Sequence, residues 1–289
     1  MPSLEVEAPA PAGRLWPDLG QLACLHDVSH ATLWSFMEFE GRPSYNPDLL
    51  ADFHGWQRHI PALKDEVGEA LKYVVLGSRH PGAFCFGGDL DHFMACIGRR
   101  DREALIAYGR SCITILHRNW RSCERDLITI GLVQGDALGG GFESLLSFDI
   151  LVAEKGVKFG FPEQLFGLFP GMGALTFLGR KLGSAKAEWL VRTGRTLTAE
   201  ELYELGIVHV LAEPGQGIDA TRRYITKSAP RFESQLRMHR AMKRAAPVSY
   251  EELDDIVVIW ADACMQLDAH NLTVMRRLIA AQTRMSAAA

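Results

Sequence analysis

Short apolar runs alternate with longer amphipathic stretches through the first two thirds of the chain. Residues 73–78 and 127–133 are almost wholly apolar and end at turn residues, a pattern typical of buried strands. Residues 21–39 predict two strands around a turn at Ser29 and His30, and two more short strands are expected within 149–161. Helices are predicted at 46–68, 89–97, 101–122 and from Gly139 to Phe148.

The last third of the chain has a predominantly helical pattern after Gly171. Thr198 and Glu201 form a capping-box pattern, with Gly206 expected just beyond the end of that helix. The residues from Ser249 onward predict helix for more than thirty positions, with one apolar stripe composed of Trp260, Cys264, Leu267, Met275 and Leu278. Strands followed by loops and helices indicate an α/β fold. We therefore expect a flexible tail (1–18), a core (19–215) and a helical C-terminal region (216–289) for covering or oligomerisation.

Composition narrows the class of protein. The 289 residues are 47% hydrophobic and 23% charged, which is ordinary for a globular protein, and the net charge of −4 argues against a general nucleic-acid binder. The N-terminus lacks the basic start and apolar stretch of a signal peptide, and no apolar run approaches the ~18 residues of a membrane span. Six scattered cysteines, none in a CxxC pair, favour free thiols in a reducing compartment, so a cytoplasmic location is expected.

Two glycine-rich loops follow predicted strands and precede predicted helices. Gly139, Gly140 and Gly141 stand two residues before Glu143, and residues 83–90 form the second loop. A dinucleotide fingerprint lacks its third glycine here, and a phosphate-binding P-loop lacks its lysine. A tight strand-to-helix turn explains one or two glycines but not the nearby acid. Exposed backbone N–H groups that stabilise an oxyanion explain both, with one donor from each loop.

A second acid completes a candidate catalytic pair. Glu163 follows Pro162 in an apolar segment, so the two residues could simply open a helix, where proline and an acid are both favoured. The rival interpretation pairs Glu163 with Glu143, because apolar surroundings raise carboxyl pKa values toward neutrality and suit acid–base catalysis.

Other candidates for chemistry have weaker patterns. The ten histidines show no metal-binding spacing, and no GxSxG motif occurs. Asp89 and Asp149 are expected to be helix caps or structural acceptors. A basic cluster, interpreted as a solvated helix face or a site for an acidic partner, comprises Arg237, His239, Arg240, Lys243 and Arg244.

The segments FCFGGDL (84–90), QGDALGGGFE (134–143), GFPEQLFGLFPGMGA (160–174) and TLTAEELYELGIVHVL (196–211) together resemble the crotonase (enoyl-CoA hydratase/isomerase) superfamily. The resemblance implies a spiral of ββα units with a helical C-terminal region, assembled as trimers or hexamers. It also implies an oxyanion hole formed by the N–H groups of Phe86, Gly87 and Gly140, and it makes Glu143 and Glu163 the catalytic acids. No cofactor or metal is expected.

Within that superfamily, GGGFE, LFGLFPGMGA and IWADACMQL resemble the bacterial diffusible-signal-factor synthases. This likeness implies dehydration of a medium-chain 3-hydroxyacyl thioester on acyl carrier protein, then thioester hydrolysis, giving a cis-2-unsaturated quorum-sensing fatty acid. A sensor-kinase receiver domain is an implied partner. An ordinary enoyl-CoA hydratase/isomerase and a catalytically silent binding protein are the alternatives. The acyl chain is expected in an apolar pocket formed by Phe142, Phe166, Met172, Trp260 and Leu278.

Overall fold

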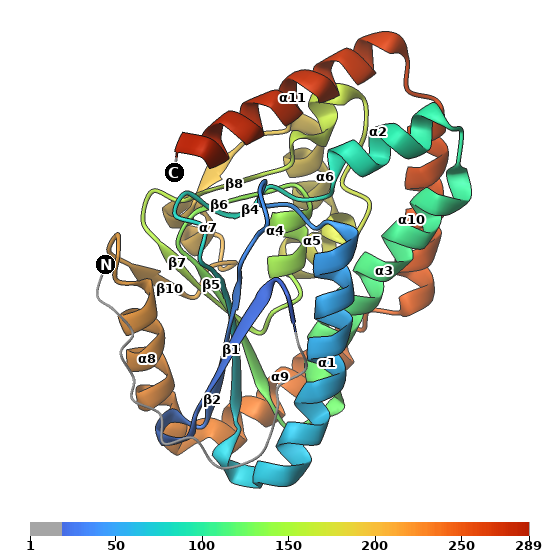
Figure 1. Ribbon diagram of the computed structural model, residues 1–289. Coiled ribbons are helices and arrows are strands. Elements are labelled where there is room, and N and C mark those ends of the chain that lie inside the picture. The colour runs from blue at the N-terminus through green and yellow to red at the C-terminus, as the bar shows by residue number, and fades with distance from the viewer. Residues whose placement is uncertain (1–18, 289) are drawn as a thin grey trace.

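Two β-sheets organise the protein, whose computed structural model describes residues 19–288; the predicted tail at 1–18 lies outside the described residues (Figure 1). The larger sheet has the order β1-β2-β3-β5-β7-β10 and is parallel except for the β1–β2 pair. Its strands are β1 (Leu22–Asp27), β2 (Thr32–Met37), β3 (Tyr73–Ser78), β5 (Ile128–Val133), β7 (Ile150–Glu154) and β10 (Val210–Ala212).

The smaller sheet has the order β4-β6-β8-β9. Its strands are β4 (Ala83–Cys85), β6 (Asp136–Leu138), β8 (Lys158–Gly160) and β9 (Leu197–Thr198). The pairs β4–β6 and β6–β8 are parallel, whereas β9 pairs antiparallel with β8. Consecutive strands therefore divide between the sheets, as β3 then β4, β5 then β6, and β7 then β8, each followed by a helix. This is the predicted succession of ββα units.

Helices cover both sheets. They are α1 (Pro47–Val67), α2 (Leu90–Gly98), α3 (Arg102–Trp120), α4 (Gly140–Leu145), α5 (Ala174–Leu182), α6 (Ser184–Thr193), α7 (Ala199–Glu204), α8 (Gly217–Ser228), α9 (Phe232–Ala245), α10 (Tyr250–Met265) and α11 (Ala269–Ala288), with a 3₁₀ helix η4 (Pro162–Phe166). Residues of α8 and α9 pack on one face of the larger sheet in a core of their own, whereas α10 lies along α3 (Figure 1). Helix α11 crosses above α2 and contacts η4.

Most predicted elements are confirmed within two residues or so, because strong local signals fix their ends. Asn46 caps α1 by accepting the N–H of Leu49, at 2.8 Å. The capping box of Thr198 and Glu201 forms in both directions. Within residues 19–288 no helix has the length and hydropathy needed to cross a membrane.

Two expectations are corrected. The helix predicted to run unbroken from Ser249 is interrupted after Met265, and the Asp268 carboxylate accepts the N–H of Asn271 at 2.8 Å to start α11. The apolar stripe continues through the break, so periodicity alone did not reveal it. The short strands of the smaller sheet were also partly missed, since two- or three-residue strands carry almost no periodic signal.

Candidate active site

Three loops meet at one edge of the smaller sheet. Because β4, β6 and β8 are parallel, their carboxyl ends lie on the same side, where ligands commonly bind in such sheets. β4 leads into Gly87 and Gly88, β6 into Gly139, and β8 into Pro162 and Glu163. The topology thus brings together the two glycine loops and the second acid, which lie far apart in sequence.

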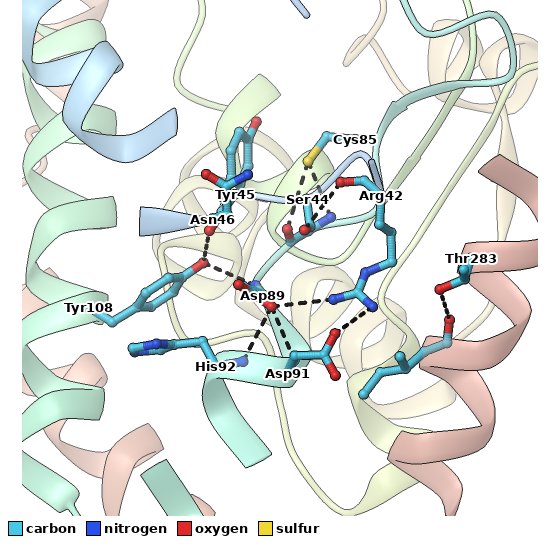
Figure 2. Close-up of polar contacts among 12 residues, drawn as sticks. Arg42, Ser44, Tyr45, Asn46, Cys85, Asp89, Asp91, His92, Tyr108 and Thr283 are labelled. Atoms are coloured by element: carbon cyan, nitrogen blue, oxygen red, sulfur yellow. Dashed lines mark hydrogen bonds and ion pairs between the residues drawn. The ribbon is translucent and has the colours of Figure 1, made fainter. Parts of the chain in front are cut away.

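The first loop is fixed by polar contacts with α3 and with the segment before α1 (Figure 2). The Tyr108 hydroxyl donates to the Tyr45 carbonyl at 2.6 Å and accepts the Asp89 N–H at 3.2 Å. The Tyr45 N–H donates to the Gly87 carbonyl at 2.8 Å. Asp89 also pairs with Arg42, at 3.3 Å, and caps α2. Asp89 is therefore a structural residue, as predicted, and it holds the loop at the edge of the site.

Two of the three amides predicted for the oxyanion hole are engaged elsewhere. The Phe86 N–H donates to the Pro43 carbonyl at 2.7 Å, and the Gly87 N–H lies 3.3 Å from the Cys85 sulfur. The Gly88 N–H, by contrast, has no acceptor among residues 19–288. Sequence reasoning missed Gly88, since each glycine of the loop is equally permissive and only the folded path shows which amide stays free. In this loop the free amide is therefore that of Gly88, not those of Phe86 and Gly87.

The amide of Gly140, the other predicted donor, is also free. It is the first residue of α4, where an N–H has no intrahelical partner, and no acceptor for it occurs in the described part of the chain. A Cβ built on Gly140 would lie 3.3 Å from the Gly88 nitrogen, so the two free amides are close neighbours. A Cβ on Gly87 would lie 2.7 Å from the Gly140 nitrogen, and its φ of +99° also requires glycine.

Glu143 is buried in α4, 1% exposed, with a stabilised carboxylate. Its Oε1 accepts the N–H groups of Met172 and Ala174 at 2.8 and 3.0 Å. Burial raises the pKa of Glu143 to about 7, and the two backbone donors oppose that shift by favouring the charged form. These bonds also tie the loop before α5 to the acid.

Glu163 lies in η4 and is less well satisfied. Its buried Oε2 has no hydrogen-bond partner among the described residues. Burial, and then the charge of Glu143, raise the pKa of Glu163 to about 8. The pair thus holds a proton near neutral pH. We place it on Glu163, because two loop N–H groups stabilise the Glu143 anion, whereas Glu163 has only its own backbone N–H and lies beside the charge of Glu143. Gly139 makes room for this acid, since a Cβ there would lie 2.6 Å from Glu163 Oε1.

One cavity of ≈450 Å³ is lined by both glutamates and both free amides. Four of the five residues predicted for the acyl pocket also line it, namely Phe166, Met172, Trp260 and Leu278. The predicted position of Phe142 is wrong: its ring stacks on Phe161, with centroids 5.0 Å apart, inside the core. Aromatic rings are favoured both in an acyl pocket and in the hydrophobic core, so the sequence did not show in which of the two Phe142 lies.

The roof of the cavity comes from the C-terminal helices. Trp260 of α10 packs over Gly171, where a Cβ would lie 2.4 Å from the indole, and meets Phe93 of α2 at 5.0 Å between ring centroids. Leu278 and the buried Gln282 of α11 close the other side. Gln282 and Phe93 were not anticipated, because a glutamine and a further aromatic residue on helices carry no local signal that they face the site.

The remaining candidates have structural roles. Asp149 accepts the N–H and hydroxyl of Thr129 at 2.9 and 3.0 Å and pairs with Lys243 at 2.6 Å. In the predicted basic cluster, Arg240 likewise pairs with Asp126, so part of this surface is neutralised within the chain. No group of three or more potential metal ligands occurs in residues 19–288.

Comparison with known proteins supports one family. The sequence model of the enoyl-CoA hydratase/isomerase family matches residues 59–279. Methylglutaconyl-CoA hydratase of Rattus norvegicus is 30% identical over 195 residues, covering 68% of this chain and 58% of that protein. Probable enoyl-CoA hydratase echA8 of Mycobacterium tuberculosis is 38% identical over 125 residues, 43% of this chain and 49% of that protein. The chain thus spans about half the length of these curated relatives.

Solved structures show the same fold at lower identity. Human mitochondrial delta3-delta2-enoyl-CoA isomerase aligns with a TM-score of 0.73 at 16% identity, over 92% of this chain and 99% of the isomerase. Pseudomonas aeruginosa DspI aligns with a TM-score of 0.65 at 20% identity, over 84% and 93% of the two chains. Together with the family match across most of the sequence, these findings show that the chain belongs to the enoyl-CoA hydratase/isomerase family and has the crotonase fold.

Proposed function

We propose that the protein dehydrates a medium-chain 3-hydroxyacyl thioester and then hydrolyses the product, releasing a cis-2-unsaturated fatty acid that serves as a quorum-sensing signal. One observation carries the chemistry: two carboxyl groups with raised pKa values and two free amides line one cavity. The amides of Gly88 and Gly140 are the donors for the thioester oxygen, and they stabilise the enolate that forms when the adjacent C–H bond breaks.

The environments of the two acids suggest their roles in dehydration. Glu143, whose anion has two backbone donors, takes the proton from Cα. Glu163 has an unpaired Oε2, and burial and the charge of Glu143 raise its pKa, so it stays protonated. It gives its proton to the departing hydroxyl, and water leaves. This step leaves Glu143 protonated and Glu163 ionised.

Hydrolysis then restores the starting state. The Glu163 carboxylate takes a proton from a water that attacks the thioester carbon, while the same amides hold the tetrahedral oxyanion. Glu143 returns its proton to the departing thiolate as the C–S bond breaks. Each glutamate thus returns to its starting protonation state. The two reactions can therefore take place in one cavity without another acid or base.

Mass spectrometry of the products tests this proposal. Purified protein is given 3-hydroxydodecanoyl-carrier protein and the matching CoA thioester, beside the Glu143→Gln and Glu163→Gln variants. A free cis-2-enoic acid that is absent with both variants supports the proposal. A reversible trans-2-enoyl thioester without free acid contradicts it and favours an ordinary hydratase, as the two curated relatives are named. No turnover of either thioester would instead favour a binding role.

The carriers and partners belong to the same proposal. We propose acyl carrier protein as the carrier, with CoA as the alternative tested in the assay above. A trimeric or hexameric assembly and a sensor-kinase receiver domain as regulatory partner rest on the resemblance of the sequence to the signal-factor synthases.

A further inference from the structure

A second cavity, which we call the chamber, lies behind the catalytic one. Its lining is almost wholly apolar. Gly88, Gly140 and Met172 line both cavities, so the chamber begins directly beside the two free amides. Most of its other walls come from α1, α3 and α4: Leu50, Phe53, Trp56, Gln57, Tyr108, Cys112, Ile115, Leu116, Asn119 and Ser144.

Hydroxyl groups that line the chamber are paired with one another or with the backbone. The Tyr45 and Ser144 hydroxyls are 2.6 Å apart. Ser147 donates to the Ser144 carbonyl at 2.6 Å and accepts from Asn119 Nδ2 at 2.9 Å. The Tyr108 hydroxyl donates to a backbone carbonyl. These hydroxyl groups therefore need no hydrogen bond from a ligand, and the wall of the chamber can accept a hydrocarbon chain.

Two amide side chains are the exceptions. Gln57 is fully buried and donates to the Ile115 carbonyl at 2.8 Å, while its Oε1 has no partner. Asn119 is 3% exposed, and its Oδ1 is likewise without a partner. Both line the chamber. A methyl group in contact with these two oxygens would exclude water from them without supplying a hydrogen bond. The desolvation of each acceptor makes that contact unfavourable.

Helix α3 gives the length of the chamber. Tyr108 lies at the catalytic end, because its hydroxyl is 3.5 Å from a Cβ position at Gly88. Asn119 follows Tyr108 by eleven residues on the same helix, which corresponds to a distance of about 16 Å at 1.5 Å per residue. An extended chain of single bonds advances about 1.2 Å per bond, as the peptide backbone does, so about 13 bonds fit along this span.

We propose that the distal acyl chain of the substrate lies in this chamber, and that Gln57 and Asn119 limit the part within it to about fourteen carbons. The inference rests on the proposed function and assigns the chain to the space between α1 and α3, leaving the catalytic cavity beneath Trp260 for the reacting carbons. Met172 stands where the two cavities meet, and its flexible thioether lets the chain pass.

Fluorescence quenching locates the chain without any turnover. Trp56 lines only the chamber and Trp260 only the catalytic cavity. We expect 12-bromododecanoic acid to quench the protein, and Trp56→Phe to remove most of that quenching while Trp260→Phe leaves it. The isomer 2-bromododecanoic acid should show the opposite dependence. Loss of 12-bromo quenching in Trp260→Phe, or no quenching by either acid, overturns the proposal.

Chain-length selectivity supplies the second test. Cys112→Phe fills the middle of the chamber, so the ratio of kcat/KM for 3-hydroxydodecanoyl over 3-hydroxybutyryl thioester should fall by at least ~10-fold. Ala107→Phe, at an exposed position on the same helix, is the control that retains the ratio. An equal loss on both thioesters would mean general damage and overturn the assignment. If the wild-type protein turns over no 3-hydroxyacyl thioester, the proposed function fails, and the quenching experiment still decides where a fatty chain binds.

Discussion

Replacing Glu163 by glutamine changes both the chemistry and the pH dependence of folding stability. The carboxyl is held in an apolar cavity beside Glu143, with an unpaired Oε2, and its pKa is raised from 4.5 to about 8. Glutamine has nearly the same shape and carries no titratable proton. The variant therefore removes the unfavourable ionisation and leaves the packing almost unchanged.

The sign follows from the direction of the shift. Because the folded protein binds the proton more tightly than the unfolded chain, the stability that this proton contributes is complete below pH 4.5 and is lost as the pH rises toward 8. For a single site with these two pKa values, the free energy of unfolding of the wild type is lower than its low-pH value by about 1 kcal/mol at pH 5 and by about 4 kcal/mol at pH 8. As the pH rises from 5 to 8, the difference in unfolding free energy between Glu163→Gln and the wild type should therefore grow by about 3 kcal/mol in favour of the variant.

Urea unfolding at a series of pH values from 5 to 8 measures this difference. Glu204→Gln, an exposed glutamate on α7, is the matched control and should follow the wild type at every pH. We also expect Glu163→Gln to lose dehydration by ~10²–10⁴-fold, since the proton donor is gone. A constant stability difference between variant and wild type from pH 5 to pH 8 would refute the argument that Glu163 is protonated in the folded state.

Three further perturbations test the site and the chamber. Gly87→Ala places a Cβ 2.7 Å from the Gly140 nitrogen and should abolish turnover, whereas Gly98→Ala, with open space around it, should leave kcat unchanged in the same assay. Tyr108→Phe leaves a buried carbonyl and N–H unpaired and should lower the free energy of unfolding by about 1–3 kcal/mol in a urea titration. Asn119→Leu removes an unpaired acceptor from the chamber, so the chain-length optimum in a competition assay should move to longer acyl thioesters; an optimum that stays or shortens contradicts the proposed end wall.

Local signals in the sequence were enough for the element order and for both acids. Some features depend only on residues within a few positions of each other, so they can be predicted from the sequence. They are the buried strands, the α1 cap at Asn46 and the capping box at Thr198. Glu143 and Glu163 stood out because each is an acid in an apolar segment. Gly88, in contrast, could not be separated from Gly87 by sequence.

What the sequence determined by itself is the succession of strands and helices, the family resemblance and the identity of the two acids, since these depend on residue types and short spacings. Only the tertiary structure decided which amides remain free, that Phe142 packs in the core, and that Phe93 and Gln282 also line the catalytic cavity. The chamber between α1 and α3 also depends on contacts between residues far apart in the chain, such as the 2.8 Å bond from Gln57 to the Ile115 carbonyl. Local sequence patterns do not predict such contacts, because the two residues come together only after the ββα units have packed against each other.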